Sequence, residues 1–126
     1  MVLEAVKPHY QALEAIKPNY QEAIQAALDC LSVCESCAST CLQDDEASAL
    51  TRCIHLSWEC AAVCDGMTKS LLGGSKYAQD WVLLCIEVCE DCAAECERHD
   101  HPCCRACAEA CRACARVCGE LLLTLA

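Results

Sequence analysis

Residues 85–118 read CIEVCEDCAAECERHDHPCCRACAEACRACARVC and carry ten of the seventeen cysteines of the chain. The first four cysteines of this stretch follow one another at steps of four, three and four, and the run from Cys104 to Cys118 repeats steps of three and four. Such steps place side chains on one stripe of an α-helix. The stretch therefore predicts two amphipathic helices, joined by a short turn, whose buried stripes consist of thiols instead of leucines.

Two stretches upstream have the same spacing. The first predicts a helix over residues 18–42, with Pro18 in its first turn, where the missing N–H is harmless. Its stripe is formed by Cys30, Cys34, Cys37 and Cys41. The second predicts a helix over residues 46–72, with the stripe Cys53, Ser57, Cys60, Cys64, Met67 and Leu71. Ser57 stands where the rhythm calls for another ligand.

Short segments separate the expected helices. The acids of residues 43–46 could cap the second helix. Gly73 and Gly74 should end it, since glycine readily takes the left-handed cap, and Ser75 could be the N-cap of a third helix over residues 76–99. A fourth helix begins near Pro102, keeps its stripe through Cys118 and continues toward residue 125.

Four helices joined by short turns predict an all-α fold, an antiparallel up-down-up-down four-helix bundle with a cysteine-lined core, over residues 18–126. Residues 1–17 should form an N-terminal arm or a short helix, because residues 4–23 contain the near-repeat EAVKPHYQAL and EAIKPNYQEA. This topology brings the first and third turns together at one end, called here the histidine end, near Cys41, Cys53, Cys96, His99, His101 and Cys103. The opposite, apolar end should collect Ala23, Met67, Leu71, Trp81, Leu121 and Leu125.

Composition and charge exclude several classes of protein. A net charge of −10 argues against a nucleic-acid partner, and no cationic amphipathic face is present for anionic lipid. No run of eighteen apolar residues predicts a membrane span, and the N-terminus does not resemble an export signal, so we expect a cytoplasmic protein. Thiols stay reduced there, and the cysteine count is odd, so metal binding or redox chemistry is favoured over a disulfide scaffold.

The chemistry of the stripes favours copper. Thiolates are soft ligands that suit Cu(I), and cysteines four apart on one helix, or on facing helices, can bind one ion from two sides. If each Cu(I) displaces one proton and each thiolate bridges two ions, the loaded core is neutral and holds about one Cu(I) per cysteine. Zinc in Cys₄ sites would leave two negative charges per ion, with no lysine or arginine on the stripes to offset them. A zinc- or cadmium-binding, metallothionein-like buffer remains the alternative.

The candidate metal ligands are the seventeen cysteines and the two histidines of the histidine end: Cys30, Cys34, Cys37, Cys41, Cys53, Cys60, Cys64, Cys85, Cys89, Cys92, Cys96, Cys103, Cys104, Cys107, Cys111, Cys114, Cys118, His99 and His101. His99 continues the stripe of the third helix, and His101 lies in the same turn. The dipole of the fourth helix should favour thiolate at Cys103 and Cys104, which with the histidines would receive incoming Cu(I).

Other residues are assigned to packing or to the surface. His55 lies about 200° around its helix from Cys53, so we expect it at the surface, and His9 belongs to the N-terminal repeat. Met67 is expected to pack in the apolar end, with copper ligation as the less favoured alternative. Trp58 and Trp81 are expected to serve packing or an interface. The acids of the third helix, among them Glu87, Glu90, Asp91 and Glu95, should form a solvated face.

These motifs resemble one known family. CIHLSWECAAVC, the CxxxCxxCxxxC blocks, AAECERHDHPCCRACAEACRACARVC and NYQEAI look like the bacterial copper storage proteins, Csp, over about residues 19–118. The resemblance implies a four-helix bundle that stores many Cu(I) ions in its core, with His99 and His101 where copper enters. It also implies a tetramer for the cytosolic members. Family members often carry cysteine where this chain has Ala23 and Ala27, and aspartate where it has Ser57.

Rival functions lack their signatures. A disulfide-exchange enzyme would need a βαβ context around CxxC, and no strand pattern occurs. The spacing of a bacterial iron–sulfur protein, C-x2-C-x2-C-x3-C-P, is also missing. No catalytic constellation is found, so we expect no enzyme. The expected partners are copper ions, with a copper chaperone as a candidate donor.

Overall fold

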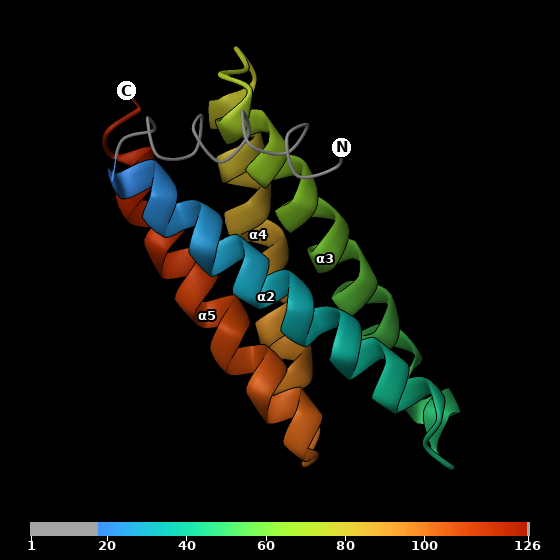
Figure 1. The fold of residues 1–126 in the computed structure, drawn as a ribbon. Coiled ribbons are helices and arrows are strands. Elements are labelled where there is room, and N and C mark those ends of the chain that lie inside the picture. Colours follow the sequence, from blue (N-terminus) through green and yellow to red (C-terminus); the bar gives the residue numbers. More distant parts are fainter. Residues whose placement is uncertain (1–17, 126) are drawn as a thin grey trace.

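The computed structural model describes residues 18–125, and within them every long element is an α-helix (Figure 1). The helices are α2 (Pro18–Leu42), α3 (Thr51–Leu72), α4 (Ala78–Cys96) and α5 (Pro102–Leu122), with a short 3₁₀ helix, η1 (Ala47–Leu50), before α3. The described residues contain no β-strand. The predicted arm or short helix of residues 1–17, and His9 with it, lies outside the described residues.

The helices alternate in direction and form an antiparallel bundle. Helix α2 packs against α3 and α5, and α4 packs against the same two helices, so each helix has two neighbours around one core. Figure 1 shows the start of α2 beside the end of α5, next to the turn between α3 and α4. Asn19 Nδ2 donates a hydrogen bond of 3.0 Å to Thr124 Oγ1 at this end. The predicted up-down-up-down four-helix bundle is confirmed.

The start of α3 differs from the prediction. We placed it at residue 46, but the helix begins at Thr51, and Ala47–Leu50 forms a 3₁₀ helix first. Asp44 Oδ1 accepts a hydrogen bond of 2.8 Å from the Glu46 backbone N–H, so this acid caps the turn and not the helix. The tighter 3₁₀ turn places Leu50 in the core with 8% of its surface exposed.

Helix α4 is shorter than predicted at both ends. Gly74 adopts the left-handed conformation with φ 63°, as expected for a glycine just beyond the end of α3. Ser75 Oγ accepts a hydrogen bond of 3.0 Å from Tyr77 N–H in the turn, and α4 begins only at Ala78. It ends at Cys96, so His99 belongs to the turn that leads to Pro102.

The core consists of a column of cysteine side chains, followed by aliphatic side chains at the apolar end. All the cysteines except Cys103 are buried, and Cys103 is partly exposed. At the apolar end, Val82, Leu71 and Leu121 have 0%, 2% and 2% of their surface exposed. The bundle therefore has a sulfur-rich core that is closed by aliphatic side chains at one end.

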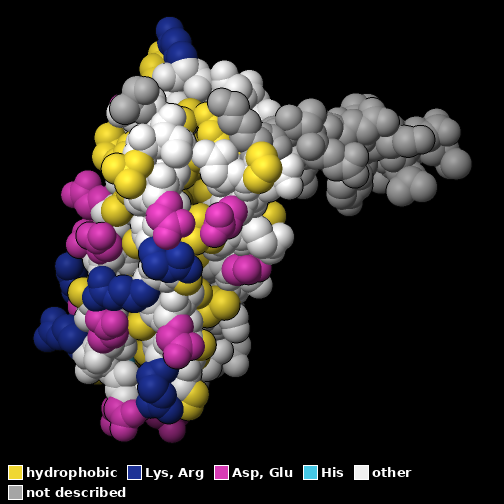
Figure 2. All heavy atoms as spheres, turned by 90° about the vertical axis from the view of Figure 1, so that its left-hand side faces the viewer, with side chains coloured by type: hydrophobic (Ala, Val, Ile, Leu, Met, Phe, Trp, Pro, Cys, Tyr) yellow, Lys and Arg dark blue, Asp and Glu magenta, His cyan; other side chains and the backbone are white. Residues whose placement is uncertain are grey.

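The outer surface carries the charge. Figure 2 shows acidic and basic side chains interspersed along the length of the bundle on one face. No helix within residues 18–125 is long and apolar enough to cross a membrane.

Candidate metal-binding core

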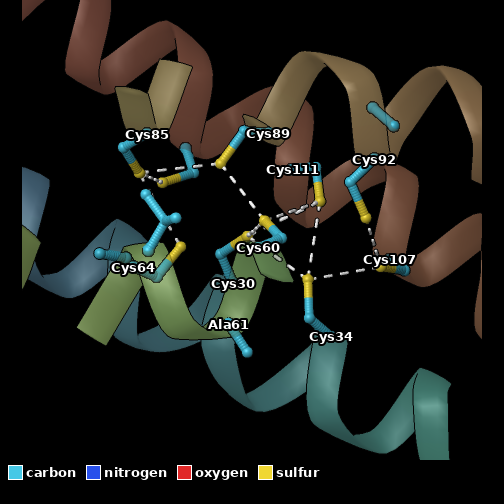
Figure 3. Close-up of a cluster of buried hydrophobic side chains, with 14 of the residues drawn as sticks. Cys30, Cys34, Cys60, Ala61, Cys64, Cys85, Cys89, Cys92, Cys107 and Cys111 are labelled. Carbon is cyan, nitrogen blue, oxygen red and sulfur yellow. Dashed lines mark hydrogen bonds between the residues drawn. The ribbon is translucent and has the colours of Figure 1, made fainter. Parts of the chain in front are cut away.

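Sulfur atoms from all four helices point toward one another inside the bundle (Figure 3). Cys34 Sγ of α2 lies 3.5 Å from Cys107 Sγ of α5, and Cys60 Sγ of α3 lies 3.6 Å from Cys89 Sγ of α4. Cys30 Sγ contacts Cys60 Sγ at 3.8 Å and so connects these helices. The stripes predicted for separate helices therefore meet in one network.

Neighbouring thiols form sets of four that share members. In each set, all the Sγ atoms lie within 4.8 Å of one another, and every cysteine is buried. Four of these sets form a chain in which each shares two members with the next: Cys34, Cys92, Cys107 and Cys111; Cys30, Cys34, Cys60 and Cys111; Cys30, Cys60, Cys64 and Cys89; Cys64, Cys85, Cys89 and Cys114. A further set, Cys37, Cys41, Cys53 and Cys104, lies toward the histidine end. Two sulfurs on opposite sides of a Cu(I) ion are separated by about 4–4.5 Å, given bonds close to the metal–sulfur length of zinc sites. The thiols can thus bind Cu(I) with small shifts of their side chains.

Ser57 interrupts the network at its middle. The residue has 0% of its surface exposed, and its Oγ lies 3.9 Å from Cys92 Sγ and 3.8 Å from Cys107 Sγ. The serine therefore occupies the position that the spacing assigns to a ligand, but it presents a hydroxyl where a softer ligand would bind copper.

His101 and Cys103 lie together at the histidine end. His101 Nδ1 accepts a hydrogen bond of 3.3 Å from the Cys103 backbone N–H and lies 3.1 Å from Cys103 Sγ. The side chain of His101 thus caps the N-terminus of α5. Its Nε2 lies 3.6 Å from Asp44 Oδ2, across the two turns. Because Nδ1 accepts the backbone hydrogen bond, the neutral ring carries its proton on Nε2, and the one lone pair of Nδ1 is engaged by the cap.

His99 contacts a buried carboxylate instead of a thiol. Its Nε2 lies 2.7 Å from Glu95 Oε2. Arg52 Nε of α3 lies 3.2 Å from Glu95 Oε1, and Arg98 Nη1 lies 3.6 Å from the same oxygen. A carboxylate that accepts from Nε2–H leaves Nδ1 as the ligand atom of the ring.

The burial of Glu95 corrects the sequence analysis. We assigned Glu95 to a solvated acidic face, but only 7% of its surface is exposed. The residue precedes Cys96 on α4 and lies one turn before His99, on the side that Arg52 covers. A buried carboxylate requires such partners, and the sequence gives no direct sign of which residue of α3 will supply one.

The thiols of the histidine end favour their neutral form. Burial raises the pKa of Cys41, Cys103 and Cys104 above the ordinary value for cysteine. We expected the dipole of α5 to favour thiolate at Cys103 and Cys104, and this expectation is wrong. Desolvation inside the bundle outweighs the dipole at Cys103 and Cys104, so these two thiols keep their protons in the metal-free protein.

His55 and Trp81 lie where the sequence placed them. His55 is exposed, and its ring stacks on Trp58 with a centroid distance of 6.4 Å. Trp81 is partly buried and packs over Gly66 at the apolar end.

A surface hollow of about 250 Å³ lies between the two turns of the histidine end. Its lining includes Asp44, Glu46, Leu50, Arg98, His99 and His101. The hollow places both histidines at the boundary between solvent and the thiol core.

A four-helix bundle with thiols from every helix in one buried network defines a metal-binding bundle of the copper-storage type. The chain matches the family model of the copper storage proteins, Csp, over residues 16–123. The chain belongs to this family.

Individual relatives agree with this assignment. The chain is 40% identical over 88 residues to YhjQ of Bacillus subtilis, described as an uncharacterized cysteine-rich protein, with 70% of this chain and 82% of YhjQ covered. It is 36% identical to the Cu(I)-bound copper storage protein BsCsp3, with a TM-score of 0.80, covering 82% of this chain and 98% of that one.

The chain is also 35% identical to the copper storage protein Ccsp of Streptomyces lividans, loaded with 10 copper equivalents. The TM-score is 0.82, and the match covers 88% of this chain and 89% of Ccsp. Another Streptomyces lividans structure, described as a cytosolic copper storage protein with five coppers, is 36% identical, with a TM-score of 0.80. The match covers 83% of this chain and 92% of that one.

Proposed function

We propose that the protein stores many Cu(I) ions, which the thiolates of its core bind inside the bundle. The observation that carries this proposal is the sulfur network of the core, in which overlapping sets of four Sγ atoms lie within 4.8 Å of one another. In a protein with isolated metal sites, the sets of ligands would have no cysteine in common. Shared members allow each thiolate to bridge two ions, so the core can hold a chain of ions.

Charge supports copper over zinc. The buried polar or charged residues within residues 18–125 are Ser57, Thr68, Ser70 and Glu95, and none is a cation. A core that exchanges one proton for each Cu(I) keeps its charge unchanged on loading. Zinc in Cys₄ sites would add two negative charges per ion, and burying them without a counter-charge is costly. The zinc or cadmium buffer is therefore not favoured.

The ligands in this proposal are the seventeen cysteines, with His99 and His101 acting at the entrance. Copper enters at the histidine end, because the surface hollow, both imidazoles and the partly exposed Cys103 lie there. The apolar end is closed by buried Leu71, Val82 and Leu121. Imidazole holds Cu(I) less strongly than thiolate, so it can pass the ion inward.

The storage role also indicates where the protein acts and with which partners. A storage role requires no catalysis, and we infer that the protein is not an enzyme. We place it in the cytoplasm, where thiols stay reduced, in line with the cytosolic relative from Streptomyces lividans. A tetramer and delivery of copper by a chaperone complete the proposal, and both rest on the family resemblance.

The capacity for copper tests the function directly. We expect the reduced protein to bind about one Cu(I) per cysteine, because bridging thiolates keep the core neutral. An anaerobic titration against a chromogenic Cu(I) chelator measures this stoichiometry. Saturation at four or five ions would refute storage and favour separate Cys₄ sites. A parallel titration with Zn²⁺ is the control, and tighter or more abundant zinc binding would favour the metal-buffer alternative.

A further inference from the structure

The sulfur network does not end on a thiol. Cys118 Sγ on α5 lies 4.0 Å from Cys114 Sγ and 3.6 Å from Met67 Sδ on α3. Met67 has 0% of its surface exposed, and Cys118 likewise. From the sequence we favoured packing over copper ligation for Met67, but its sulfur lies against the last thiol of the column.

We propose that Met67 Sδ, together with the thiolates of Cys114 and Cys118, forms the innermost Cu(I) site of the protein. This inference rests on the proposed storage function and extends it to a ligand that is not a cysteine. Cys114 also lies 3.9 Å from Cys85 Sγ, so the site is continuous with the rest of the network.

The geometry suits three-coordinate Cu(I). Three sulfurs around one ion, with bonds of about 2.2–2.3 Å, are separated from one another by about 3.8–4.0 Å. The two distances from Cys118 Sγ, 3.6 Å to Met67 Sδ and 4.0 Å to Cys114 Sγ, bracket this range. For these two sulfur pairs, an ion requires shifts of only a few tenths of an ångström. On loading, each bound thiol releases its proton to solvent and forms a copper–sulfur bond, while the thioether adds a bond without losing any group.

The surroundings explain why a thioether is suitable. At the apolar end, the core contains the buried side chains of Ala23, Ala27, Leu71 and Leu121, which are all hydrocarbon. A further thiolate there would add a negative charge that no buried cation offsets. A thioether is a soft ligand that completes the coordination without charge. Helix α2 carries no sulfur before Cys30, and Met67 of α3 adds a sulfur ligand beyond the thiols.

Selenium labelling tests the site, because the chain has only two methionines, Met1 and Met67. The selenomethionine-labelled protein is loaded with Cu(I) to saturation under anaerobic conditions, and X-ray absorption is measured at the selenium edge. We expect a selenium–copper scattering path at roughly 2.4 Å, slightly longer than a metal–sulfur bond. The labelled Met67→Leu variant retains selenium at residue 1 alone and is the matched control, in which the path should vanish.

The outcomes separate this inference from the storage function. Full copper loading with no selenium–copper path would overturn the Met67 site and leave storage intact. Failure to retain several ions would refute both. The same path in Met67→Leu would assign it to residue 1 and likewise overturn the inference. Since leucine matches methionine in volume, the variant should keep its fold. If the variant fails to fold, the spectrum of the labelled wild-type protein still decides the question.

Discussion

At the scale of single residues, the two histidines differ in what holds them. His101 caps α5 through Nδ1, which also lies 3.1 Å from Cys103 Sγ, so an ion that binds Nδ1 must replace the capping hydrogen bond. His99 is fixed by Glu95, which accepts from Nε2 and leaves Nδ1 as the ligand atom. Both imidazoles are therefore oriented before copper arrives, and both stand outside the sulfur column.

The double variant His99→Ala and His101→Ala should load and release Cu(I) more slowly, with its capacity nearly unchanged. The physical reason is that imidazole transfers the ion at the entrance, whereas thiolates store it. Stopped-flow exchange with a chelator measures both rates. His55→Ala, a change at an exposed histidine, is the control and should leave the rates unchanged. Equal rates in the double variant and the wild type would place the entrance elsewhere.

The variant Ser57→Cys should raise the copper capacity by about one ion. Its sulfur would lie near Cys92 and Cys107, whose Sγ atoms are 3.9 and 3.8 Å from the present hydroxyl. A thiolate there can bridge ions on both sides of the gap. Anaerobic titration counts the ions, with Ser57→Ala as the control that should keep the wild-type capacity. An unchanged count in Ser57→Cys would show that the core leaves no room for another ion at that level.

The spacing of the cysteines predicted which residues face the core. It did not predict contacts between side chains of different helices. The cysteine rhythm predicted the buried stripe of each helix, because a helical stripe follows from sequence separation alone. Cys103, which does not follow the rhythm, is partly exposed. Glu95 was misassigned because its burial depends on Arg52, which belongs to another helix. The contact of Met67 with Cys118 was missed for the same reason, since it depends on how α3 and α5 align.

At the scale of elements, α3 and α4 pack closely through one small residue. A Cβ atom added at Gly66 of α3 would lie 2.4 Å from two carbons of the Trp81 ring on α4. The glycine thus allows the indole to lie against the backbone of α3. The sequence predicted both helices, but it did not reveal this contact, which depends on the relative height of α3 and α4. The 3₁₀ start before α3 was missed for a similar reason, since burial of Leu50 sets the path of the turn.

Gly66→Ala should destabilise the metal-free protein by about 1–3 kcal/mol, because the rigid indole must move. Gly119→Ala is the matched control. A Cβ added there meets nothing within 4 Å, so alanine should stabilise α5 by about 0.5–1 kcal/mol. Chemical denaturation followed by circular dichroism compares the two variants. Equal effects of the two changes would show that Trp81 does not pack on Gly66 in solution.

At the scale of the whole molecule, the core can be either empty of metal or full of it without a change in charge. Neutral thiols pack as small apolar side chains, so the metal-free bundle should be folded and helical near neutral pH. Loading replaces S–H protons with Cu(I), while the helices keep their arrangement. This separates the protein from small zinc domains, whose folding depends on the metal.

The pH dependence of stability follows from the raised pKa of the thiols at the histidine end. Burial raises the pKa of Cys41, Cys103 and Cys104, so the folded state keeps protons that the unfolded chain releases above its ordinary thiol pKa of about 8.5. The unfolded state then binds fewer protons than the native state, and the free energy of unfolding falls as pH rises. Stability should be fully present below about pH 8 and decline toward pH 10.

Copper loading should abolish most of this decline, because the loaded thiolates have no protons left to lose. Thermal unfolding of the metal-free and loaded forms at pH 7, 8.5 and 10, without oxygen and with enough guanidinium to bring both transitions into range, measures the effect. The loaded form is also the control for tyrosine and lysine, whose titration both forms share. A metal-free protein whose Tm stays constant or rises from pH 7 to pH 10 would contradict a core of neutral thiols, and with it the charge argument that favours Cu(I) over zinc.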